Sequence, residues 1–323
     1  MSAATIQAYP APARPVAGRE YHRWMRDEPT AGAELDEAAD TFLQVRPRLF
    51  GIAYRVLGSA SDAEDVVQEA WLRWQRYDRS TVDDPRAFLA TTTTRLAINV
   101  AQSARARRET YIGPWLPEPV DTSADPTLGA ERDEALGFAV MLLMEKLTPT
   151  ERAAYVLREA FDYPFSQIAE IIQTSEANTR QLVSRARKHL AAERQAKPVD
   201  PAEQRRLLDT FLAAAQTGDL TELESMFAAD VVSYADGGGI VRASRIPVRG
   251  RETVAKYIRA FAPRFWVGVS LRPVETNGEP AVALVRDGAI FAVVALSSSA
   301  EGIDRLLWMM NPQKLARVAS VSA

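Results

Sequence analysis

The segment FSQIAEIIQTSEANTRQLVSRARKHL (residues 165–190) predicts two amphipathic helices joined by a tight polar turn. On the first helix, apolar residues recur at the i, i+3, i+4 and i+7 spacing of one buried face, namely Phe165, Ile168, Ala169 and Ile172. Ser175 is a good N-cap for the second helix, which again carries apolar residues on one side only. The pattern is typical of a helix-turn-helix.

The outer face of the second helix is crowded with basic, amide and hydroxyl side chains. Arginine and lysine bind phosphates or guanine, asparagine and glutamine can pair with adenine, and serine adapts to either. We interpret this face as DNA-binding, although the solvated face of an ordinary helical hairpin would also carry charges. The candidate contacts are Ser175, Asn178, Thr179, Arg180, Gln181, Ser184, Arg185 and Lys188.

The composition describes an ordinary globular protein with two or three domains. The chain has 323 residues, of which 47% are hydrophobic, and a formal net charge of −3 at pH 7. It has no cysteine and only His22 and His189, so we expect no metal site, no cofactor and no catalytic residues. No apolar run approaches the roughly 20 residues that span a bilayer, and no signal peptide is evident. We therefore expect a cytoplasmic protein without membrane contact.

Helical periodicity in the first part of the chain is interrupted by the segment YIGPWLPEPVDTSADP (residues 111–126). Its prolines exclude a helix and predict an extended linker. Thr148, Pro149 and Glu151 form a capping box that predicts the start of another helix. Beyond about residue 201, two helices precede segments that favour strands, with one more helix among them and a hairpin signal at Asp287-Gly288. The expected strands are residues 231–235, 240–248, 266–274, 280–285, 289–296 and 303–310.

These patterns predict a multidomain fold, in which two all-α domains are followed by an α+β domain. The boundaries that we expect are a flexible N-terminal tail at residues 1–34, a helical domain at 35–110, the linker at 111–129, the helix-turn-helix domain at 130–197, the α+β domain at 198–316 and a C-terminal tail at 317–323.

The two helical segments before the linker carry charges of opposite sign. Residues 61–77 present an acidic face beside an apolar stripe, whereas residues 85–108 are rich in arginine. An acidic helix face is usually only solvated, but this reversal suggests one surface for a basic protein partner and another for DNA. Trp71 and Trp74 could stack on bases, although their helical spacing favours the core.

In these segments the chain resembles the extracytoplasmic-function (ECF) sigma factors, which direct bacterial RNA polymerase to promoters. Residues 62–74 resemble the family's polymerase-binding helix, residues 85–108 the helix that reads the −10 element, and residues 147–190 the domain that reads the −35 element. The resemblance covers about half of the chain and implies core RNA polymerase and promoter DNA as partners. It assigns polymerase binding to Asp62, Glu64, Asp65, Gln68 and Glu69, −10 contacts to Arg95, Asn99, Gln102 and Arg105, and −35 contacts to the helix-turn-helix residues named above.

The α+β segment resembles the SnoaL-like members of the NTF2-like cone fold. With YIGPWLPEP at residues 111–119, DGGG at 236–239 and NPQKL at 311–315, the chain is similar to the SigJ (ECF41) type of sigma factor. This type implies control by the C-terminal domain and no separate anti-sigma factor. The sequence departs from the pattern at Ile240 and Gln313, where the family often has Lys and Asp. The implied regulatory contacts are Trp115, Leu116, Pro117, Asp236, Gly237, Gly238, Gly239, Asn311 and Pro312.

We hypothesise that the C-terminal domain grips the linker and the first domain, with Trp115 as a large apolar anchor and the glycines allowing close approach. Two alternatives stay open. The chain could be a helix-turn-helix regulator that acts without polymerase. Its cone domain could also bind a small-molecule ligand or be an enzyme. The enzyme would use Tyr234 and Asp236 as an acid-base pair, with an anion bound by Arg242, Arg245 and Arg249.

Overall fold

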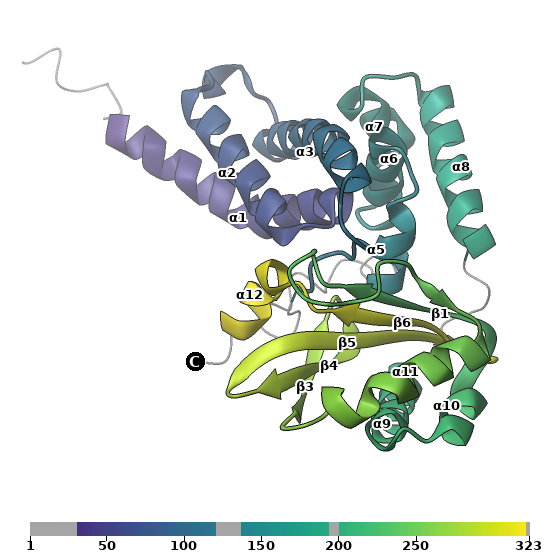
Figure 1. The fold of residues 1–323 in the computed structure, drawn as a ribbon. Coiled ribbons are helices and arrows are strands. Elements are labelled where there is room, and N and C mark those ends of the chain that lie inside the picture. The colour runs from purple at the N-terminus through teal and green to yellow at the C-terminus, as the bar shows by residue number, and fades with distance from the viewer. Residues whose placement is uncertain (1–30, 121–136, 194–199, 321–323) are drawn as a thin grey trace, which may run out of the picture.

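The computed structural model describes residues 31–120, 137–193 and 200–320, and these form a helical half and a sheet half that pack on each other (Figure 1). Residues 1–30 of the expected N-terminal tail lie outside the described ranges, as do 121–129 of the linker. The same holds for 130–136 and 194–197 of the helix-turn-helix domain, 198–199 of the α+β domain and 321–323 of the C-terminal tail. Within the described ranges, no helix combines the length and the apolarity that a membrane span would need.

The helical half contains the predicted helix-turn-helix and the capping box at Thr148. Apolar side chains from all of its longer helices meet in a single core, so the two expected helical domains do not have separate interiors. The helices are α1 (Ala31–Leu57), α2 (Ala60–Arg76), the 3-10 helix η1 (Arg79–Thr81), α3 (Pro85–Glu109), α5 (Phe138–Met144), α6 (Pro149–Glu159), α7 (Phe165–Ile171) and α8 (Glu176–Glu193).

The C-terminal domain is built on a six-stranded mixed sheet with the order β2-β1-β6-β5-β4-β3. Strands β1 and β6 are parallel, and every other neighbouring pair is antiparallel. The elements are α9 (Pro201–Thr217), α10 (Leu220–Met226), β1 (Phe227–Asp236), β2 (Val248–Arg249), α11 (Arg251–Phe265), β3 (Ser270–Thr276), β4 (Glu279–Arg286), β5 (Ala289–Ser299), β6 (Gly302–Met309) and α12 (Pro312–Ser320).

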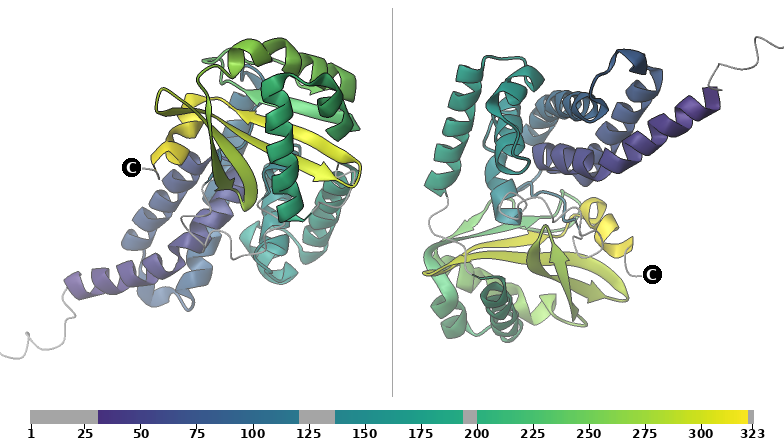
Figure 2. Two further views of the ribbon diagram at one scale, coloured as in Figure 1. Left: turned by 90° about the horizontal axis from the view of Figure 1, so that it is seen from below. Right: turned by 180° about the vertical axis from the view of Figure 1, so that it is seen from behind.

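The two faces of this sheet have different partners. Helices α9, α10 and α11 cover one face, where Phe211, Phe227 and Trp308 are buried (Figures 1 and 2). The other face is turned toward the helical half and buries Leu116 of the linker together with Phe138 of α5 and residues of α12. Because side chains alternate along a strand, β1, β4, β5 and β6 each contribute to both cores. The linker therefore lies between the two halves.

Several local expectations are confirmed and two are wrong. Asp287 and Gly288 both have positive φ angles, as a type I′ turn requires, and Trp74 is buried in the core. Most of the expected strand at residues 240–248 is irregular, and only β2 remains of it. The expected C-terminal tail is also shorter, because α12 continues to Ser320 and buries Val318.

We predict that Thr148→Ala lowers the free energy of unfolding by about 1 kcal/mol, since it removes the oxygen that accepts from the backbone N–H of Glu151 at the start of α6. Thr210→Ala, in the exposed middle of α9, is the matched control and should have little effect or slightly stabilise the protein. Urea unfolding followed by circular dichroism measures both. Equal midpoints for Thr148→Ala and the wild type would contradict the prediction.

Candidate DNA-reading surfaces and the linker site

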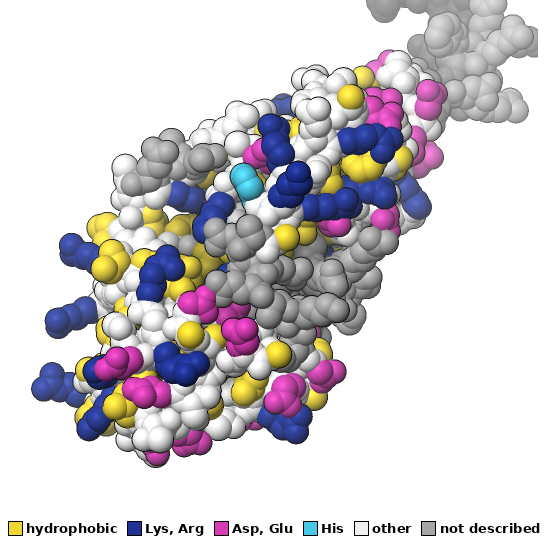
Figure 3. All heavy atoms as spheres, turned by 90° about the vertical axis from the view of Figure 1, so that its right-hand side faces the viewer, with side chains coloured by type: hydrophobic (Ala, Val, Ile, Leu, Met, Phe, Trp, Pro, Cys, Tyr) yellow, Lys and Arg dark blue, Asp and Glu magenta, His cyan; other side chains and the backbone are white. Residues whose placement is uncertain are grey.

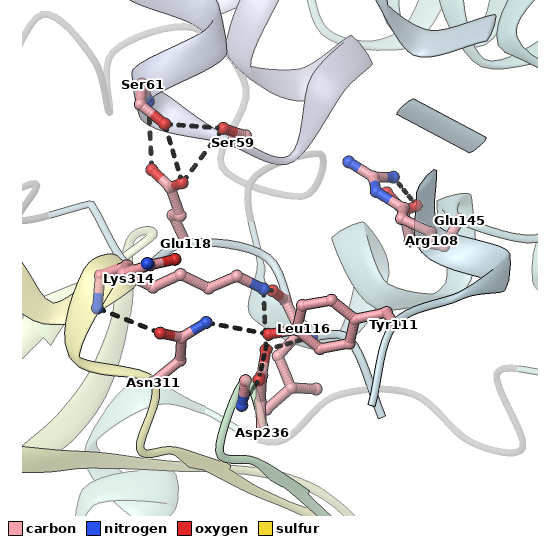
Figure 4. A network of polar contacts seen from close by, with 12 residues as sticks. Ser59, Ser61, Arg108, Tyr111, Leu116, Glu118, Glu145, Asp236, Asn311 and Lys314 are labelled. Atoms are coloured by element: carbon pink, nitrogen blue, oxygen red, sulfur yellow. Dashed lines mark hydrogen bonds and ion pairs between the residues drawn. The ribbon is translucent and has the colours of Figure 1, made fainter. Parts of the chain in front are cut away.

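Asp236 is the centre of a polar network that joins the linker to the C-terminal domain (Figure 4). It is the last residue of β1, and its side chain has no exposure to solvent. One carboxylate oxygen accepts from the Tyr111 hydroxyl at 2.6 Å, and the other accepts from the Leu116 backbone N–H at 2.9 Å and from the Lys314 ammonium at 2.7 Å. We call Tyr111, Leu116, Asp236, Asn311 and Lys314 the linker site.

Helix α12 supplies the other side of the linker site. The Asn311 side-chain amide donates to the Tyr111 hydroxyl at 2.9 Å, while its carbonyl oxygen accepts from the Gln313 backbone N–H at the start of α12. Lys314 also donates to the Leu116 carbonyl oxygen. Pro312 is exposed and begins the helix that positions its neighbours, and its expected role as a contact stays a prediction.

Burial controls the energetics of these groups. Desolvation lowers the pKa of Lys314 although the charge of Asp236 opposes the shift. Burial, together with the hydrogen bond to Asp236, raises the pKa of Tyr111, so this hydroxyl remains a donor. Because both charges are removed from water, the ion pair contributes little net stability, but it holds the two side chains in one geometry.

Leu116, and not Trp115, is the apolar anchor of the linker. Leu116 is fully buried against the sheet, in contact with the cluster that includes Leu307 and Leu315. Trp115 is only half-buried, and its ring lies between two cations, with the Arg108 guanidinium 3.6 Å and the Lys314 ammonium 4.0 Å from the ring centroid. The expected role of Trp115 as the anchor is therefore corrected.

Arg108 extends this stack into the helical half. It is paired with Glu145, which also pairs with Arg152 of α6. Arg152 donates to the Val56 carbonyl oxygen at the end of α1, at 3.0 Å. Through the Trp115 ring, Lys314 of the C-terminal domain is thus connected to Arg108 of the first helical segment and to Glu145 and Arg152 of the second.

The glycines after Asp236 allow the close approach that the sequence predicts. A Cβ on Gly237 would lie 2.3 Å from the Val241 carbonyl oxygen, and one on Gly238 would lie 2.4 Å from the Asn311 amide. Gly238 and Gly239 also have positive φ angles. A Cβ on Gly239 would press on Ile112 of the linker, at 3.1 Å.

Glu118 connects the linker to the helix expected to bind polymerase. Its carboxylate accepts from the backbone N–H groups of Ala60 and Ser61, at 2.8 and 3.1 Å, and from the hydroxyls of Ser59 and Ser61 (Figure 4). An anion at this place complements the free N–H groups and the dipole of α2. Pro117, beside it, is buried, in keeping with its expected role as a contact.

Asn277 is a contact that sequence reasoning missed. It is buried in the turn between β3 and β4, with φ +58°. Its backbone N–H and side-chain oxygen bond to the backbone of Val120, both at 2.9 Å, and its amide donates to the Tyr54 hydroxyl at 2.6 Å. The pair Asn277-Gly278 is a hairpin signal, but nothing in that signal indicates a partner on α1. Lys314, Tyr111 and Glu118 were also missed as contacts.

The outward face of α8 carries the expected basic and polar side chains, and Figure 3 shows basic side chains gathered over this part of the molecule. Arg180 pairs with Glu176, and Arg185 pairs with Glu151 at 3.3 Å. Thr179 is the exception among the expected contacts, because it is fully buried and its hydroxyl donates to the Ser175 carbonyl oxygen. The exposed members of the set are Ser175, Asn178, Arg180, Gln181, Ser184, Arg185 and Lys188.

Arg95 of α3 is exposed, but its guanidinium is already bonded to another helix. Its guanidinium donates to the carbonyl oxygens of Ile171 and Glu170 at the end of α7, both at 2.9 Å. Asn99 and Gln102 are exposed on the same helix, and the side chain of Arg105 lies outside the described part of the chain. In this arrangement the expected −10 reader is therefore bonded to the helix-turn-helix.

The acidic face of α2 lies at the surface of the molecule. Glu64 pairs with Arg46 at 2.6 Å, and Glu69 pairs with Arg73 at 2.8 Å. These are exposed or partly exposed pairs, which contribute little to stability and can be exchanged for pairs with another protein. All five expected polymerase contacts reach the surface, at least in part: Asp62, Glu64, Asp65, Gln68 and Glu69.

The structure does not support an acid-base pair of Tyr234 and Asp236. The Asp236 carboxylate already accepts from the linker and Lys314, and also from the Gly238 backbone N–H at 3.0 Å. The three arginines that were expected to bind an anion do not line one common site. Arg242 lines a cavity beside α11, whereas Arg245 and Arg249 are not among its lining residues.

The sequence matches two known families, Sigma-70 region 2 over residues 41–108 and Sigma-70 region 4 over residues 137–190. It is 40% identical to the ECF RNA polymerase sigma factor SigJ of Mycobacterium tuberculosis over 71% of this chain and 74% of that protein. It is 32% identical to the probable ECF sigma factor SigI of the same species over 84% and 92% of the two chains.

The fold agrees with these matches. The crystal structure of Mycobacterium tuberculosis SigJ superposes with a TM-score of 0.69 at 34% sequence identity, covering 86% of this chain and 98% of that one. Two helical sigma segments are thus followed by a mixed-sheet domain, consistent with a SnoaL-like domain, in the order that the sequence predicts. The chain belongs to the ECF RNA polymerase sigma factors.

Proposed function

We propose that the C-terminal domain of this sigma factor controls promoter recognition in cis, by holding the linker so that the two DNA-reading segments stay packed together. The observation that carries the proposal is the buried Asp236 carboxylate, whose donors come from the linker and from α12. A domain that binds the linker in this way can take the place of a separate anti-sigma factor.

The packed arrangement is incompatible with reading two promoter elements at once. Elements at −10 and −35 are separated by about 25 base pairs, or roughly 85 Å of B-form DNA at about 3.4 Å per base pair. Here α3 and α7 are in contact through Arg95, and α3 and α8 belong to one core. The segments must separate before both can bind, and release of the linker would permit this.

The exposed side chains fit the roles that the resemblance assigns to them. We propose that the acidic face of α2 binds core polymerase, that Asn99 and Gln102 contact the −10 strand, and that the exposed polar face of α8 reads the −35 element. Arg95 would have two roles in this scheme: it bonds to α7 in the packed state and becomes available to DNA in the separated state.

The position of Glu118 supports coupling between the linker and the polymerase-binding helix. Because its carboxylate caps α2, a linker held by the C-terminal domain also fixes the start of α2. Asn277 adds a direct contact from the sheet to Tyr54 of α1. The C-terminal domain therefore reaches the first sigma segment by two routes.

We predict that Asp236→Asn increases run-off transcription by core polymerase and raises the affinity of the holoenzyme for promoter DNA by at least about tenfold. The substitution leaves the Lys314 ammonium buried without its counter-charge, which costs about 3 kcal/mol or more and opens the linker site. Asp230→Asn, an exposed change in the same strand, is the control and should behave like the wild type. Equal transcription from the two variants would refute control through the linker site.

A second prediction separates the two roles of Arg95. Arg95→Lys keeps a positive charge for phosphate but loses the planar pair of donors that reaches two carbonyl oxygens of α7. It should therefore raise promoter binding several-fold in the wild-type chain and have little effect in the Asp236→Asn background, where the segments are already separated. A double-mutant cycle measured by promoter-DNA anisotropy tests this. If Arg95→Lys changed promoter binding by the same factor in the wild type and in the Asp236→Asn background, the bond of Arg95 to α7 would not be what keeps it from DNA.

A further inference from the structure

A cavity of about 790 Å³ lies on the face of the sheet opposite the linker site, between α11 and the strands β1 and β6. Its size falls within the range of about 300–1,000 Å³ that is usual for small-molecule sites. The proposed control of the linker leaves this cavity without a role. Figure 1 shows α11 on the side of the sheet that faces away from the sigma helices.

Aromatic rings form the apolar wall of the cavity. Tyr257, Phe261 and Phe265 come from α11, and Trp308 comes from β6. Phe261 and Phe265 meet edge to face at 5.3 Å, and each meets Trp308 in the same way, at 6.2 and 5.8 Å. Perpendicular rings of this kind offer both faces and edges to a planar aromatic guest.

The charges at the cavity favour an anion. Arg242 and Arg264 both line the cavity, and both are exposed to solvent. Their guanidinium groups therefore remain hydrated in the empty cavity and can turn toward a bound anion. Among the described residues that line it, none is Asp or Glu. Guanidinium groups bind carboxylates and sulfonates by charge-assisted hydrogen bonds.

We propose that this cavity binds a planar aromatic monoanion, such as an aryl carboxylate or sulfonate, and that the bound ligand stabilises the linker site. The proposal deepens the control in cis described above and rests on it for its functional consequence. It assigns the rings to the body of the ligand and the two arginines to its anionic group.

Adjacent residues connect the cavity to the linker site through the sheet. Ala235 lines the cavity, and the next residue is Asp236; Met310 lines the cavity, and the next residue is Asn311. The Met310 backbone N–H donates to the Asp236 carbonyl oxygen at 2.8 Å. A shift of either strand end at the cavity would therefore move the carboxylate or the amide that holds Tyr111.

The loop after β1 provides a second connection. Arg242, Ala243 and Ser244 of this loop line the cavity together with Tyr257 of α11. On the linker side, a Cβ added to Gly113 would lie 3.7 Å from the Ser244 carbonyl oxygen. When the linker is held in the linker site, it lies against this loop, and the loop keeps its place in the cavity wall. A ligand that contacts the loop should therefore bind the state with the linker held more tightly than the state with the linker released, and so stabilise the former.

The test uses 8-anilinonaphthalene-1-sulfonate as the probe, with the uncharged N-phenyl-1-naphthylamine for comparison. In the full chain, fluorescence titration should give saturable 1:1 binding of the sulfonate and much weaker binding of the amine.

Ala260→Phe, which fills the cavity from an exposed position on α11, should abolish sulfonate binding. The double variant Arg242→Gln/Arg264→Gln should weaken it at least about tenfold. Arg251→Gln/Arg259→Gln, on the same helix but outside the cavity lining, should leave it unchanged.

Coupling is measured by hydrogen exchange and by transcription. Saturating sulfonate should slow exchange of the amides at residues 111–118 and reduce run-off transcription by the wild type, with no reduction for Ala260→Phe. Faster exchange at these residues would overturn the coupling, and sulfonate binding that survives in Ala260→Phe would overturn the site. If Asp236→Asn leaves transcription unchanged while the sulfonate still binds as expected, the control of the linker fails and the cavity stands.

Discussion

A carboxylate without access to water must obtain its hydrogen bonds from the protein, and Asp236 obtains them from parts of the chain that are far apart in sequence. Tyr111 and Leu116 belong to the linker, and Lys314 belongs to the last helix. The carboxylate is satisfied only when all of these segments are together. The C-terminal sheet, the linker and α12 therefore assemble as one unit, and the position of the sigma segments follows from it.

The charges around this unit are balanced closely. Burial lowers the pKa of both Lys314 and Arg108, and the Trp115 ring between them provides attraction without neutralising either cation. Glu145 compensates Arg108 on one side, and Asp236 compensates Lys314 on the other. Such an arrangement specifies one geometry but has little stability to spare. That property suits the proposed control in cis, in which this contact breaks before transcription begins.

Some elements of this architecture could be predicted because their signals are local. The capping box at Thr148, the helix-turn-helix periodicity and the glycines after Asp236 each depend on residues within a few positions of one another. Lys314 and Asn277 could not be found in this way. A single lysine in a short amphipathic helix and an asparagine in a hairpin turn are common, and only their distant partners distinguish them. Thr179 shows the opposite error, since a polar residue on a helix was counted as a surface contact and is buried.

The amino-acid pattern was sufficient to predict the order of the segments, the family and most of the side chains that face outward on α2 and α8. Periodicity and charge carry that information, because burial of one face and solvation of the other act over a single helix. The partners of those side chains were decided by packing. Arg95 has the charge and the donor groups of a phosphate contact. It nevertheless bonds to the carbonyl oxygens at the end of α7, because the shared core brings that helix end within reach. A guanidinium accepts either partner, and only the tertiary arrangement selects one.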